Sequence, residues 1–240
     1  MQNNSILNDP MDAIVFDCDG TLSHIEGIDE LAKNKSVVEI VSKLTEEAMG
    51  KVGINPELYQ KRLALVNPTR EEVQQLGITY FQHRAPDSAE VITVLQALGK
   101  AIYVVSAGLK PAVARFGELL KIPERHIFAV NIYFDEAGNY HHFDGDSPLV
   151  QPDGKRIIVS TLQKKHKNLL YVGDGMNDYA VYDLVTRFIG YGGAFYREQF
   201  AKRSEFYITR PTFKALLPLC LTPDEFNLVC KNNTALTDPI

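Results

Sequence analysis

A short apolar run that ends in two acidic residues constrains this chain more than any other feature of its sequence. Residues 13–16 are apolar, Asp17 and Asp19 follow one residue apart, and a Gly-Thr pair comes next. The run is too short for a helix and is typical of a buried strand. Open parallel sheets place their chemistry just beyond the carboxyl ends of strands. Two carboxylates there need a cation, a proton or hydrogen bonds, and a magnesium ion with a phosphoryl group would meet that need.

Strand and helix patterns alternate along most of the remaining chain. Five further short runs predict strands: Ala101–Val105, Ile127–Val130, Leu169–Val172, Phe188–Tyr191 and Phe206–Ile208. Helix patterns lie between most of them, and this alternation predicts an α/β fold, a doubly wound parallel sheet with helices on both faces. Residues 131–134 and 140–143 flank the turn-forming residues 136–139, which predicts a hairpin.

Residues 24 to about 84 depart from this alternation, because they contain amphipathic helix patterns and no convincing strand. Asn55 followed by proline is typical of a helix start, and Thr69 with Glu72 has the spacing of a capping box. We therefore expect a helical cap, residues 23–84, inserted after the first strand. The core domain would then consist of residues 1–22 and 85–240.

The composition excludes several classes of protein. The chain has 240 residues, of which 45% are hydrophobic, and this supports a sizeable core. With 30 acidic and 25 basic residues the formal net charge is −5, so we expect no nucleic-acid partner. No run of about 18 apolar residues occurs and residues 1–10 lack an apolar signal core, so we expect no membrane span. Three cysteines suit a reducing compartment, and we expect a cytoplasmic protein; the sequence leaves a homodimer open.

A second group of acidic residues follows the predicted strand Leu169–Val172. Asp174 and Asp178 lie there beside glycines, which let the backbone approach a ligand closely. If this strand and the strand at residues 13–16 are neighbours, three carboxylates converge on one point. Carboxylate oxygens suit magnesium, which keeps waters and shares phosphate oxygens. Zinc is disfavoured because no Cys/His ligand spacing is present.

Ser106 and Lys155 are the candidates for binding a phosphoryl group. Ser106 ends the strand Ala101–Val105, where its hydroxyl and the N–H groups of the next helix can hold a phosphate oxygen. Taken alone, such a serine is more often a turn or N-cap residue. Lys155 precedes a predicted helix and can offset the charge of a phosphate, although a lone lysine is usually a solvated surface charge. Lys110 is the alternative for this role.

These elements, in this order, resemble the four motifs of the haloacid dehalogenase (HAD) superfamily. Residues 17–21 resemble its DxDGT signature, the serine and the lysine follow, and residues 173–178 resemble its last motif. The resemblance spans residues 13 to about 210 and implies a Rossmann-like core. It also implies that Asp17 attacks phosphorus and becomes an aspartyl phosphate, while Asp19 protonates the leaving oxygen and then activates water.

The resemblance assigns roles to the other core residues as well. The implied magnesium ligands are the Asp17 carboxylate, the Asp19 backbone carbonyl and Asp174, with Asp178 orienting them. The implied phosphoryl-binding residues are Ser106, Ala107, Gly108 and Lys155. Asn177 is implied to contact the substrate.

A closer resemblance, to the phosphoserine phosphatases, lies in residues 26–32, 48–50, 62–66, 188–193 and 207–209. Matched residue by residue, Glu26 falls where that family binds the substrate's amino group, and Arg62 falls where it binds the carboxylate. Met49 falls where the family packs an apolar wall over the substrate. Without the resemblance, Glu26 is a first-turn helix acid, Arg62 a solvated helix face and Met49 plain core.

Three positions depart from this family's pattern. Gly20 stands where the family often has serine, Ala107 replaces a glycine, and Asn55 replaces a phenylalanine that helps to close the cap. Alanine serves at position 107 unless its backbone angles are left-handed. Leu58 or Tyr59 can supply the apolar surface that Asn55 lacks.

The resemblance predicts a phosphoric monoester hydrolase. The expected reaction is magnesium-dependent hydrolysis of O-phospho-L-serine to L-serine and phosphate, the last step of serine biosynthesis. The enzymatic alternative is a phosphatase or phosphotransferase acting on phosphoethanolamine, phosphocholine or a sugar phosphate. A non-catalytic scaffold that binds a phospholigand is the alternative of another class. The presence of Asp17, Asp19, Asp174 and Asp178 argues against it, because degenerate members should lose these acids.

Overall fold

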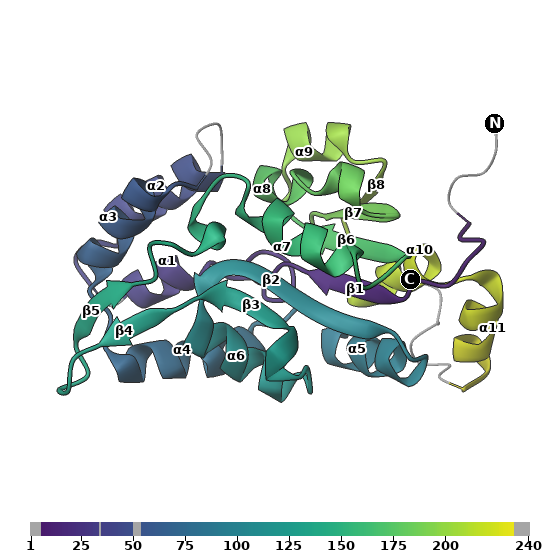
Figure 1. Cartoon of the computed structure of the whole chain (residues 1–240), viewed down its shortest axis with the longest axis horizontal. Helices are drawn as coiled ribbons and strands as arrows, with labels where there is room; N and C mark the ends of the chain where they lie inside the picture. Colours follow the sequence, from purple (N-terminus) through teal and green to yellow (C-terminus); the bar gives the residue numbers. More distant parts are fainter. Residues whose placement is uncertain (1–5, 34, 50–53, 233–240) are drawn as a thin grey trace.

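The computed structural model describes residues 6–33, 35–49 and 54–232 of the chain. Its centre is a six-stranded sheet in the order β3-β2-β1-β6-β7-β8, in which all neighbouring strands run parallel. The strands are β1 (Ala13–Phe16), β2 (Ala101–Leu109), β3 (Ile127–Val130), β6 (Leu169–Gly173), β7 (Arg187–Tyr191) and β8 (Phe206–Ile208). Every predicted strand is present, and the predicted α/β fold is confirmed (Figure 1).

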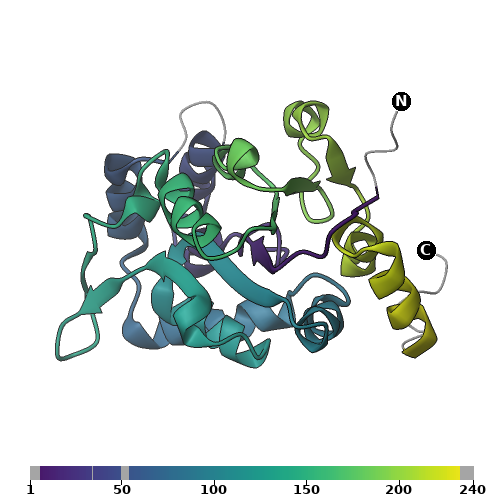
Figure 2. The ribbon, with the colours of Figure 1, turned by 45° about the vertical axis from the view of Figure 1, so that its right-hand side comes forward.

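Helices lie on both faces of this sheet. α5 (Ser88–Ala97) and α6 (Lys110–Leu119) cover one face, and α7 (Gly154–Gln163) covers the other (Figures 1 and 2). The later helices are α8 (Met176–Tyr179), α9 (Glu198–Arg203), α10 (Leu217–Cys220) and α11 (Pro223–Asn232). The molecule is therefore a doubly wound α/β fold, as the sequence predicts.

β1 lies in the middle of the sheet, between β2 and β6. Its four side chains are at most 1% exposed, as expected for a central strand of a parallel sheet. Phe16 pairs with Val104 of β2 and with Val172 of β6, so Asp17 and Asp174 leave neighbouring strands at nearly the same level. The strand order reverses at β1, and doubly wound sheets bind their ligands at such a switch point.

β2 is longer than the sequence predicts. The apolar run ends at Val105, but the strand continues to Leu109, which pairs with Val130 of β3 after a shift in register. Ser106 therefore lies inside the irregular part of β2 and does not follow the end of the strand. α6 begins directly after Leu109, and Pro111 lies in its first turn, where its missing N–H costs no helix hydrogen bond.

The segment between β1 and α5 contains the predicted helices: α1 (Gly27–Ala32), α2 (Val38–Met49), α3 (Pro56–Val66) and α4 (Arg70–Gln82). The Asn55 side chain accepts a hydrogen bond from the Leu58 N–H and caps α3. Thr69 and Glu72 form the predicted capping box of α4. α1, α2 and α3 lie beyond the carboxyl ends of the strands, whereas α4 lies beside α6 (Figure 1).

Two further segments complete the described structure. β4 (Ile132–Phe134) and β5 (Tyr140–Phe143) form the predicted antiparallel hairpin. Phe213, Leu216 and Leu217, near the carboxyl terminus, are at most 1% exposed and pack into the core. Among the described residues, no helix combines the length and the apolar character that a membrane crossing requires.

Candidate active site

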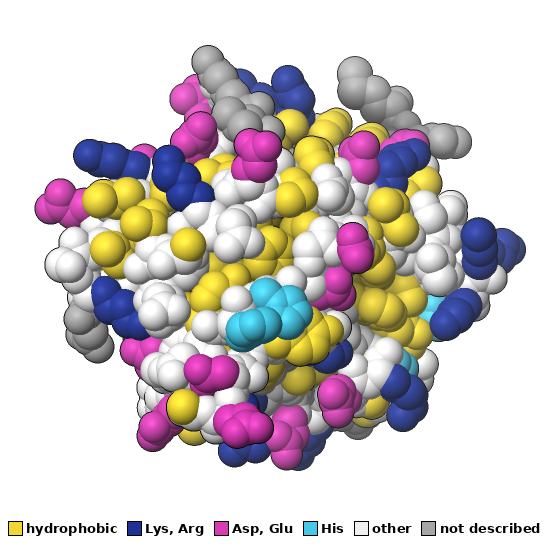
Figure 3. Space-filling view, turned by 60° about the vertical axis from the view of Figure 1, so that its left-hand side comes forward, with side chains coloured by type: hydrophobic (Ala, Val, Ile, Leu, Met, Phe, Trp, Pro, Cys, Tyr) yellow, Lys and Arg dark blue, Asp and Glu magenta, His cyan; other side chains and the backbone are white. Residues whose placement is uncertain are grey.

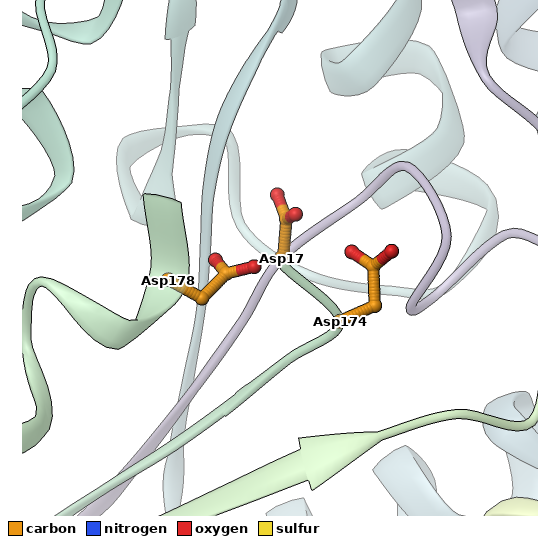
Figure 4. Close-up of side chains that lie close together, drawn as sticks. All are labelled: Asp17, Asp174 and Asp178. Carbon is orange, nitrogen blue, oxygen red and sulfur yellow. The ribbon is translucent and has the colours of Figure 1, made fainter. Parts of the chain in front are cut away.

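Three carboxylates meet at the carboxyl edge of the sheet. Asp17 follows β1, Asp174 follows β6 and Asp178 lies on α8. One oxygen atom of each lies within 4.8 Å of those of the other two, and all three residues are at most 4% exposed. Figure 4 shows the Asp17 and Asp174 carboxylates side by side, with the Asp178 carboxylate turned toward Asp17. The convergence that we expected from neighbouring strands is therefore present.

Lys155 joins two of these carboxylates. Its Nζ atom is buried and lies 2.8 Å from Oδ1 of Asp17 and 2.6 Å from Oδ1 of Asp178. Burial alone would lower the pKa of Lys155, but the two carboxylates together outweigh burial and raise the pKa, so the ammonium stays charged. Lys110, the alternative, donates instead to the carbonyl oxygen of Ile127. Of the two lysines, Lys155 is therefore the one placed among the carboxylates.

Asp17 and Asp174 have environments that favour an added cation. Burial and the nearby charge of Asp178 raise the pKa of Asp17 well above its usual value, and they raise the pKa of Asp174 to about 6. Oδ2 of Asp174 accepts a hydrogen bond of 3.0 Å from Arg197. Oδ1 of Asp174 is buried and has no hydrogen-bond partner in the described part of the chain. Carboxylate oxygens in this state fit a hard divalent cation, so the acidic group can bind a metal.

Asp178 differs from the other two carboxylates because its oxygens already have donors. Oδ1 accepts hydrogen bonds from Lys155, at 2.6 Å, and from the Tyr171 hydroxyl, at 2.7 Å. Oδ2 accepts a hydrogen bond of 3.0 Å from the N–H of Gly175. A carboxylate held in this way fits a role in orienting Lys155 better than a role as a metal ligand.

Ser106 lies buried beside Asp19. Its Oγ accepts a hydrogen bond of 2.8 Å from the Gly108 N–H and donates one of 3.4 Å to Oδ2 of Asp19. The non-glycine residues with left-handed backbone in the described structure are Asn67, Asp87 and Lys121. Ala107 is not among them, so the backbone at position 107 does not require glycine.

The Asp19 carboxyl group lies where the core meets the helices inserted after β1. Its Oδ1 accepts hydrogen bonds from the Gly27 N–H, at 2.6 Å, and from the Tyr80 hydroxyl, at 2.7 Å. Burial raises the pKa of Asp19, and these two hydrogen bonds act against that rise. A carboxyl group whose pKa is raised by burial can hold the proton that a general acid has to deliver.

Glu26 and Arg62 approach the same pocket from α1 and α3. Burial raises the pKa of Glu26 well above its usual value and lowers the pKa of Arg62. Oε1 of Glu26 and Nε of Arg62 are buried and lack hydrogen-bond partners among the described residues, although Arg197 lies 3.6 Å from Glu26. Arg62 also donates a hydrogen bond of 3.4 Å from Nη1 to the Thr45 hydroxyl. Two opposite charges that each keep one buried polar atom without a hydrogen bond suit a ligand with an ammonium and a carboxylate group.

One pocket collects most of the predicted site. Its lining includes Asp17, Asp19, Glu26, Arg62, Ser106, Ala107, Gly108, Lys155, Asn177 and Asp178. Asp174 adjoins the pocket at the Asp17 carboxylate. Met49 is the last residue of α2, and its side chain lies outside the described part of the structure. Figure 3 views the molecule from the side on which α2, α3, β4 and β5 lie, and both acidic and basic side chains are distributed over this face.

Sequence reasoning missed three residues that contact the predicted site: Tyr80, Tyr171 and Arg197. Arg197 lies in the segment after β7, at the same edge of the sheet as Asp17, and a basic residue at that place was an available signal. For Tyr80 and Tyr171 the sequence contains no signal of a role in the site beyond the pattern of a buried helix or strand. Tyr59, one of the two residues predicted to supply apolar surface in place of Asn55, lines the pocket. Its hydroxyl donates a 3.0 Å hydrogen bond to the Ala107 carbonyl oxygen.

Comparison with known proteins first defines the class. A family model described as haloacid dehalogenase-like hydrolase matches residues 11–181. The chain therefore belongs to the haloacid dehalogenase-like hydrolases, and the resemblance seen in its four motifs is confirmed.

Individual relatives narrow this class. Phosphoserine phosphatase of Bos taurus is 36% identical over 200 residues, and that of Homo sapiens is 34% identical; each match covers 82% of this chain and 89% of the relative. The crystal structure of a phosphoserine phosphohydrolase-like protein from Francisella tularensis subsp. tularensis SCHU S4 has a TM-score of 0.75 at 25% identity, covering 83% of this chain and 96% of the other. The chain belongs to the phosphoserine phosphatase family and is a phosphoric monoester hydrolase.

Proposed function

We propose that this protein hydrolyses O-phospho-L-serine to L-serine and phosphate with the help of magnesium, the last step of serine biosynthesis. The observation that carries the proposal is the pairing of Glu26 and Arg62 in one pocket with Asp17. A carboxylate and a forked guanidinium match the ammonium and the carboxylate of an amino-acid phosphoester. The relatives named phosphoserine phosphatase support the same substrate.

The core residues would carry out the chemistry in two steps. In the first, a carboxylate oxygen of Asp17 attacks phosphorus, the bond to the serine oxygen breaks, and Asp19 gives that oxygen a proton. In the second, water attacks the aspartyl phosphate, gives a proton to Asp19 and releases phosphate from Asp17. Lys155, which contacts Asp17 at 2.8 Å, would offset the charge of the phosphoryl oxygens.

The substrate's other groups would be held by residues around this centre. The segment 106–108 would bind phosphoryl oxygens through the Ser106 hydroxyl and backbone N–H groups. Asn177, which lines the pocket at the start of α8, would contact the substrate. The role of Met49 as an apolar wall stays a prediction, because its side chain lies outside the described part of the structure.

Magnesium would be held by the carboxylates of Asp17 and Asp174 and by the backbone carbonyl of Asp19. The buried Oδ1 atom of Asp174, which has no hydrogen-bond partner among the described residues, supports this assignment. Asp178, held by Lys155, Tyr171 and Gly175, would orient the site without binding the ion. The ion supplies positive charge that polarises the phosphoryl group and neutralises its oxygens.

The helices α1 to α4 would form a cap, residues 23–84, over a core made of residues 1–22 and 85–240. The two chain crossings between these parts lie side by side: the Ala85 N–H donates to the Leu22 carbonyl, and the His24 N–H to the His83 carbonyl, both at 2.9 Å. Such a paired connection can act as a hinge, so that the cap opens for substrate and closes to exclude water. If substitutions at Thr21 and Arg84 that disturb this hinge leave turnover unchanged, the gating role is wrong.

The cysteines support a cytoplasmic location. Cys18, Cys220 and Cys230 are all free, which suits a reducing compartment. Burial raises the pKa of the Cys18 thiol well above its ordinary value, so this side chain is inert although it lies between Asp17 and Asp19. A homodimer stays a prediction, which light scattering in solution tests.

The test measures phosphate release from L-phosphoserine, phosphothreonine and phosphoethanolamine, with and without magnesium, with Asp17→Asn as the control. We expect a magnesium-dependent preference for phosphoserine that disappears in Asp17→Asn. Phosphoethanolamine lacks a carboxylate and would leave Arg62 unpaired, so it should be the poorest of the three. Equal turnover of all three esters would support the proposed phosphatase mechanism but contradict the proposal that phosphoserine is the preferred substrate. Absence of turnover on a broad panel of phosphoesters would favour a binding scaffold, and transfer of phosphate to an added alcohol would favour a phosphotransferase.

A further inference from the structure

The two oxygens of the Asp19 carboxyl group have different surroundings. Oδ1 accepts two short hydrogen bonds, from the Tyr80 hydroxyl at 2.7 Å and from the Gly27 N–H at 2.6 Å. Oδ2 lies on the side of the predicted phosphoryl-binding segment, 3.4 Å from Ser106 Oγ, and a Cβ atom added to Gly108 would lie only 3.1 Å from it. One oxygen is therefore occupied from α1 and α4, and the other faces the place expected for phosphate.

This asymmetry decides which oxygen can exchange a proton. A carboxylate oxygen has two lone pairs, and both lone pairs of Oδ1 are engaged by donors. A proton on Asp19 therefore belongs on Oδ2. We propose that Tyr80 is a positioning residue, which together with the Gly27 N–H holds Asp19 so that Oδ2 exchanges the proton in both steps. The inference rests on the proposed function, because it needs a phosphoester whose leaving oxygen takes up a proton.

The proton transfers then follow from this orientation. When Asp17 forms its bond to phosphorus, the electron pair of the breaking P–O bond stays on the substrate's oxygen, which takes the proton from Oδ2 of Asp19. Asp19 is then a carboxylate. As water attacks phosphorus, Oδ2 takes up the proton of the water, and the electron pair of the second breaking bond returns to Asp17. Tyr80 exchanges no proton in either step and keeps its hydrogen bond to Oδ1.

Tyr80 is held firmly enough to act in this way. It is 1% exposed, and its ring stacks on that of Phe116 in α6 with centroids 5.7 Å apart. α4 packs closely on α6 at this point, since a Cβ atom at Gly77 would lie 2.7 Å from the Ala112 carbonyl oxygen. Burial and the charge of Asp19 raise the pKa of Tyr80 well above its usual value, so the hydroxyl stays a donor. Tyr80 is therefore anchored to the core, although its helix belongs to the inserted segment.

Gly27 is matched to this hydroxyl. A Cβ atom at position 27 would lie 1.9 Å from Oη of Tyr80, so no larger residue fits without moving the hydroxyl. As the first residue of α1, Gly27 also has an N–H group without a partner inside the helix, and this group reaches Asp19 instead. The two donors of Oδ1 thus depend on each other sterically, and this gives a second way to disturb the arrangement.

The experiment compares two leaving groups in Tyr80→Phe, which keeps the ring and removes the hydroxyl. Serine leaves as an alcohol and needs the proton of Asp19, whereas the leaving group of p-nitrophenyl phosphate is a stabilised phenolate and needs none. General acid catalysis contributes about 10²- to 10⁴-fold, and misplacing the acid should cost part of that. We expect kcat/KM for L-phosphoserine to fall about tenfold or more, with KM changed less than about threefold, while kcat/KM for p-nitrophenyl phosphate falls less than about threefold.

Tyr59→Phe is the matched control. It also removes a tyrosine hydroxyl from this pocket, but that hydroxyl donates to the Ala107 carbonyl and not to Asp19. Any loss in this control should be the same for both esters. Equal losses for both esters in Tyr80→Phe, or no loss, would overturn the positioning role. If Tyr80→Phe does not fold, as judged by circular dichroism and thermal unfolding, Gly27→Ala replaces it. Its Cβ would lie 1.9 Å from Oη and 2.7 Å from Cζ of Tyr80, so it pushes the hydroxyl away from Asp19, and the same comparison decides.

The wild type separates this inference from the proposed function. If it prefers an alkyl phosphoester other than phosphoserine, the proposed substrate is wrong, and that ester replaces phosphoserine in the comparison. A selective loss in Tyr80→Phe then still supports the positioning role. If the wild type hydrolyses no phosphoester, both proposals are overturned.

Discussion

The site has a core half, built at the strand ends, and a cap half, built by the inserted helices. The two halves differ in how completely the protein's own groups pair with the buried charges. On the core side, Lys155 lies 2.6–2.8 Å from two carboxylates. On the cap side, Glu26 and Arg62 each bury a polar atom that lacks a hydrogen-bond partner among the described residues. The core half is thus largely assembled before substrate binds and leaves Oδ1 of Asp174 for the proposed ion, whereas the cap half leaves one polar atom on each of its two charges for the substrate.

This difference separates catalysis from recognition. Preorganised charges stabilise the reacting phosphoryl group without rearrangement at the moment of reaction. Buried polar atoms that lack hydrogen bonds gain them only from a ligand that carries the matching groups, and a substrate without those groups leaves these atoms unsatisfied. The core half should therefore set the rate for any phosphoester, and Glu26 and Arg62 in the cap half should set the choice among esters.

The largest expected effect breaks the core half. Lys155→Met keeps the length of the side chain and leaves Asp17 and Asp178 without their buried cation, so we expect the free energy of unfolding to fall by about 3–5 kcal/mol. Phosphate release should fall roughly 10²-fold or more for every ester. Urea unfolding and turnover measure the two effects.

Arg62→Met is the matched change in the cap half, and removal of an incompletely partnered buried charge should cost less than about 1 kcal/mol. Similar losses of stability in both variants would remove the contrast between the halves.

The second effect tests recognition by the cap half. Arg62→Met should lower kcat/KM for phosphoserine about 10- to 100-fold, because a charge-assisted pair of hydrogen bonds to the substrate's carboxylate is lost. Phosphoethanolamine has no carboxylate, so its kcat/KM should hardly change. Steady-state kinetics with both esters measure this, and an equal loss for both would show that Arg62 acts on the phosphoryl group instead.

The core half could be predicted from the sequence because its geometry follows from strand register. An apolar run that ends in Asp17 or Asp174 places each carboxylate at the end of a strand, and neighbouring parallel strands bring their ends to one edge. Register is strongly specified where the strand is buried, and β1 is at most 1% exposed. The extension of β2 through Ser106 could not be predicted, since it depends on the pairing of Leu109 with Val130.

The cap half could be predicted only through the resemblance. Helical periodicity indicates that Val73, Leu76 and Tyr80 share the buried face of α4, but it does not say what that face meets. Tyr80 contacts Asp19, 61 residues away along the chain, and only the packing of α4 on α6 brings them together. Arg62 shows the same limit, because a helix position alone does not tell a solvated guanidinium from a buried one.

A third prediction concerns metal binding to the core half. The pKa of Asp174 is raised to about 6 from 3.8, so the folded protein keeps this proton at a pH where the unfolded chain loses it. In metal-free protein the stability due to this carboxyl is therefore fully present below about pH 4 and is lost as pH rises to about 6. A bound cation favours the ionised form and removes that loss. Added magnesium should raise Tm by several degrees at pH 7.5 and much less at pH 5, which thermal unfolding at the two pH values measures.

Asp174→Asn is the control for this prediction. It removes both the titrating group and one proposed ligand, so the stabilisation by magnesium should become small at both pH values. If the shift in Tm is equally large at pH 5 and pH 7.5 in the wild type, protons do not compete with the ion, and the carboxyl of Asp174 is not its ligand.

The smallest expected effect lies at the contact between the halves. The Tyr59 hydroxyl on α3 donates a 3.0 Å hydrogen bond to the Ala107 carbonyl, and its ring packs on Phe143 of the hairpin with centroids 4.8 Å apart. Tyr59→Phe keeps the ring contact and loses one neutral hydrogen bond, about 1 kcal/mol. If that bond favours the closed cap, KM should rise about two- to fivefold for phosphoserine and p-nitrophenyl phosphate alike, with kcat little changed. A loss confined to phosphoserine would mean that α3 also orients Asp19. Positioning of Asp19 would then not be limited to α4, where Tyr80 lies, and the separation between a recognising cap and a preorganised core would be less sharp.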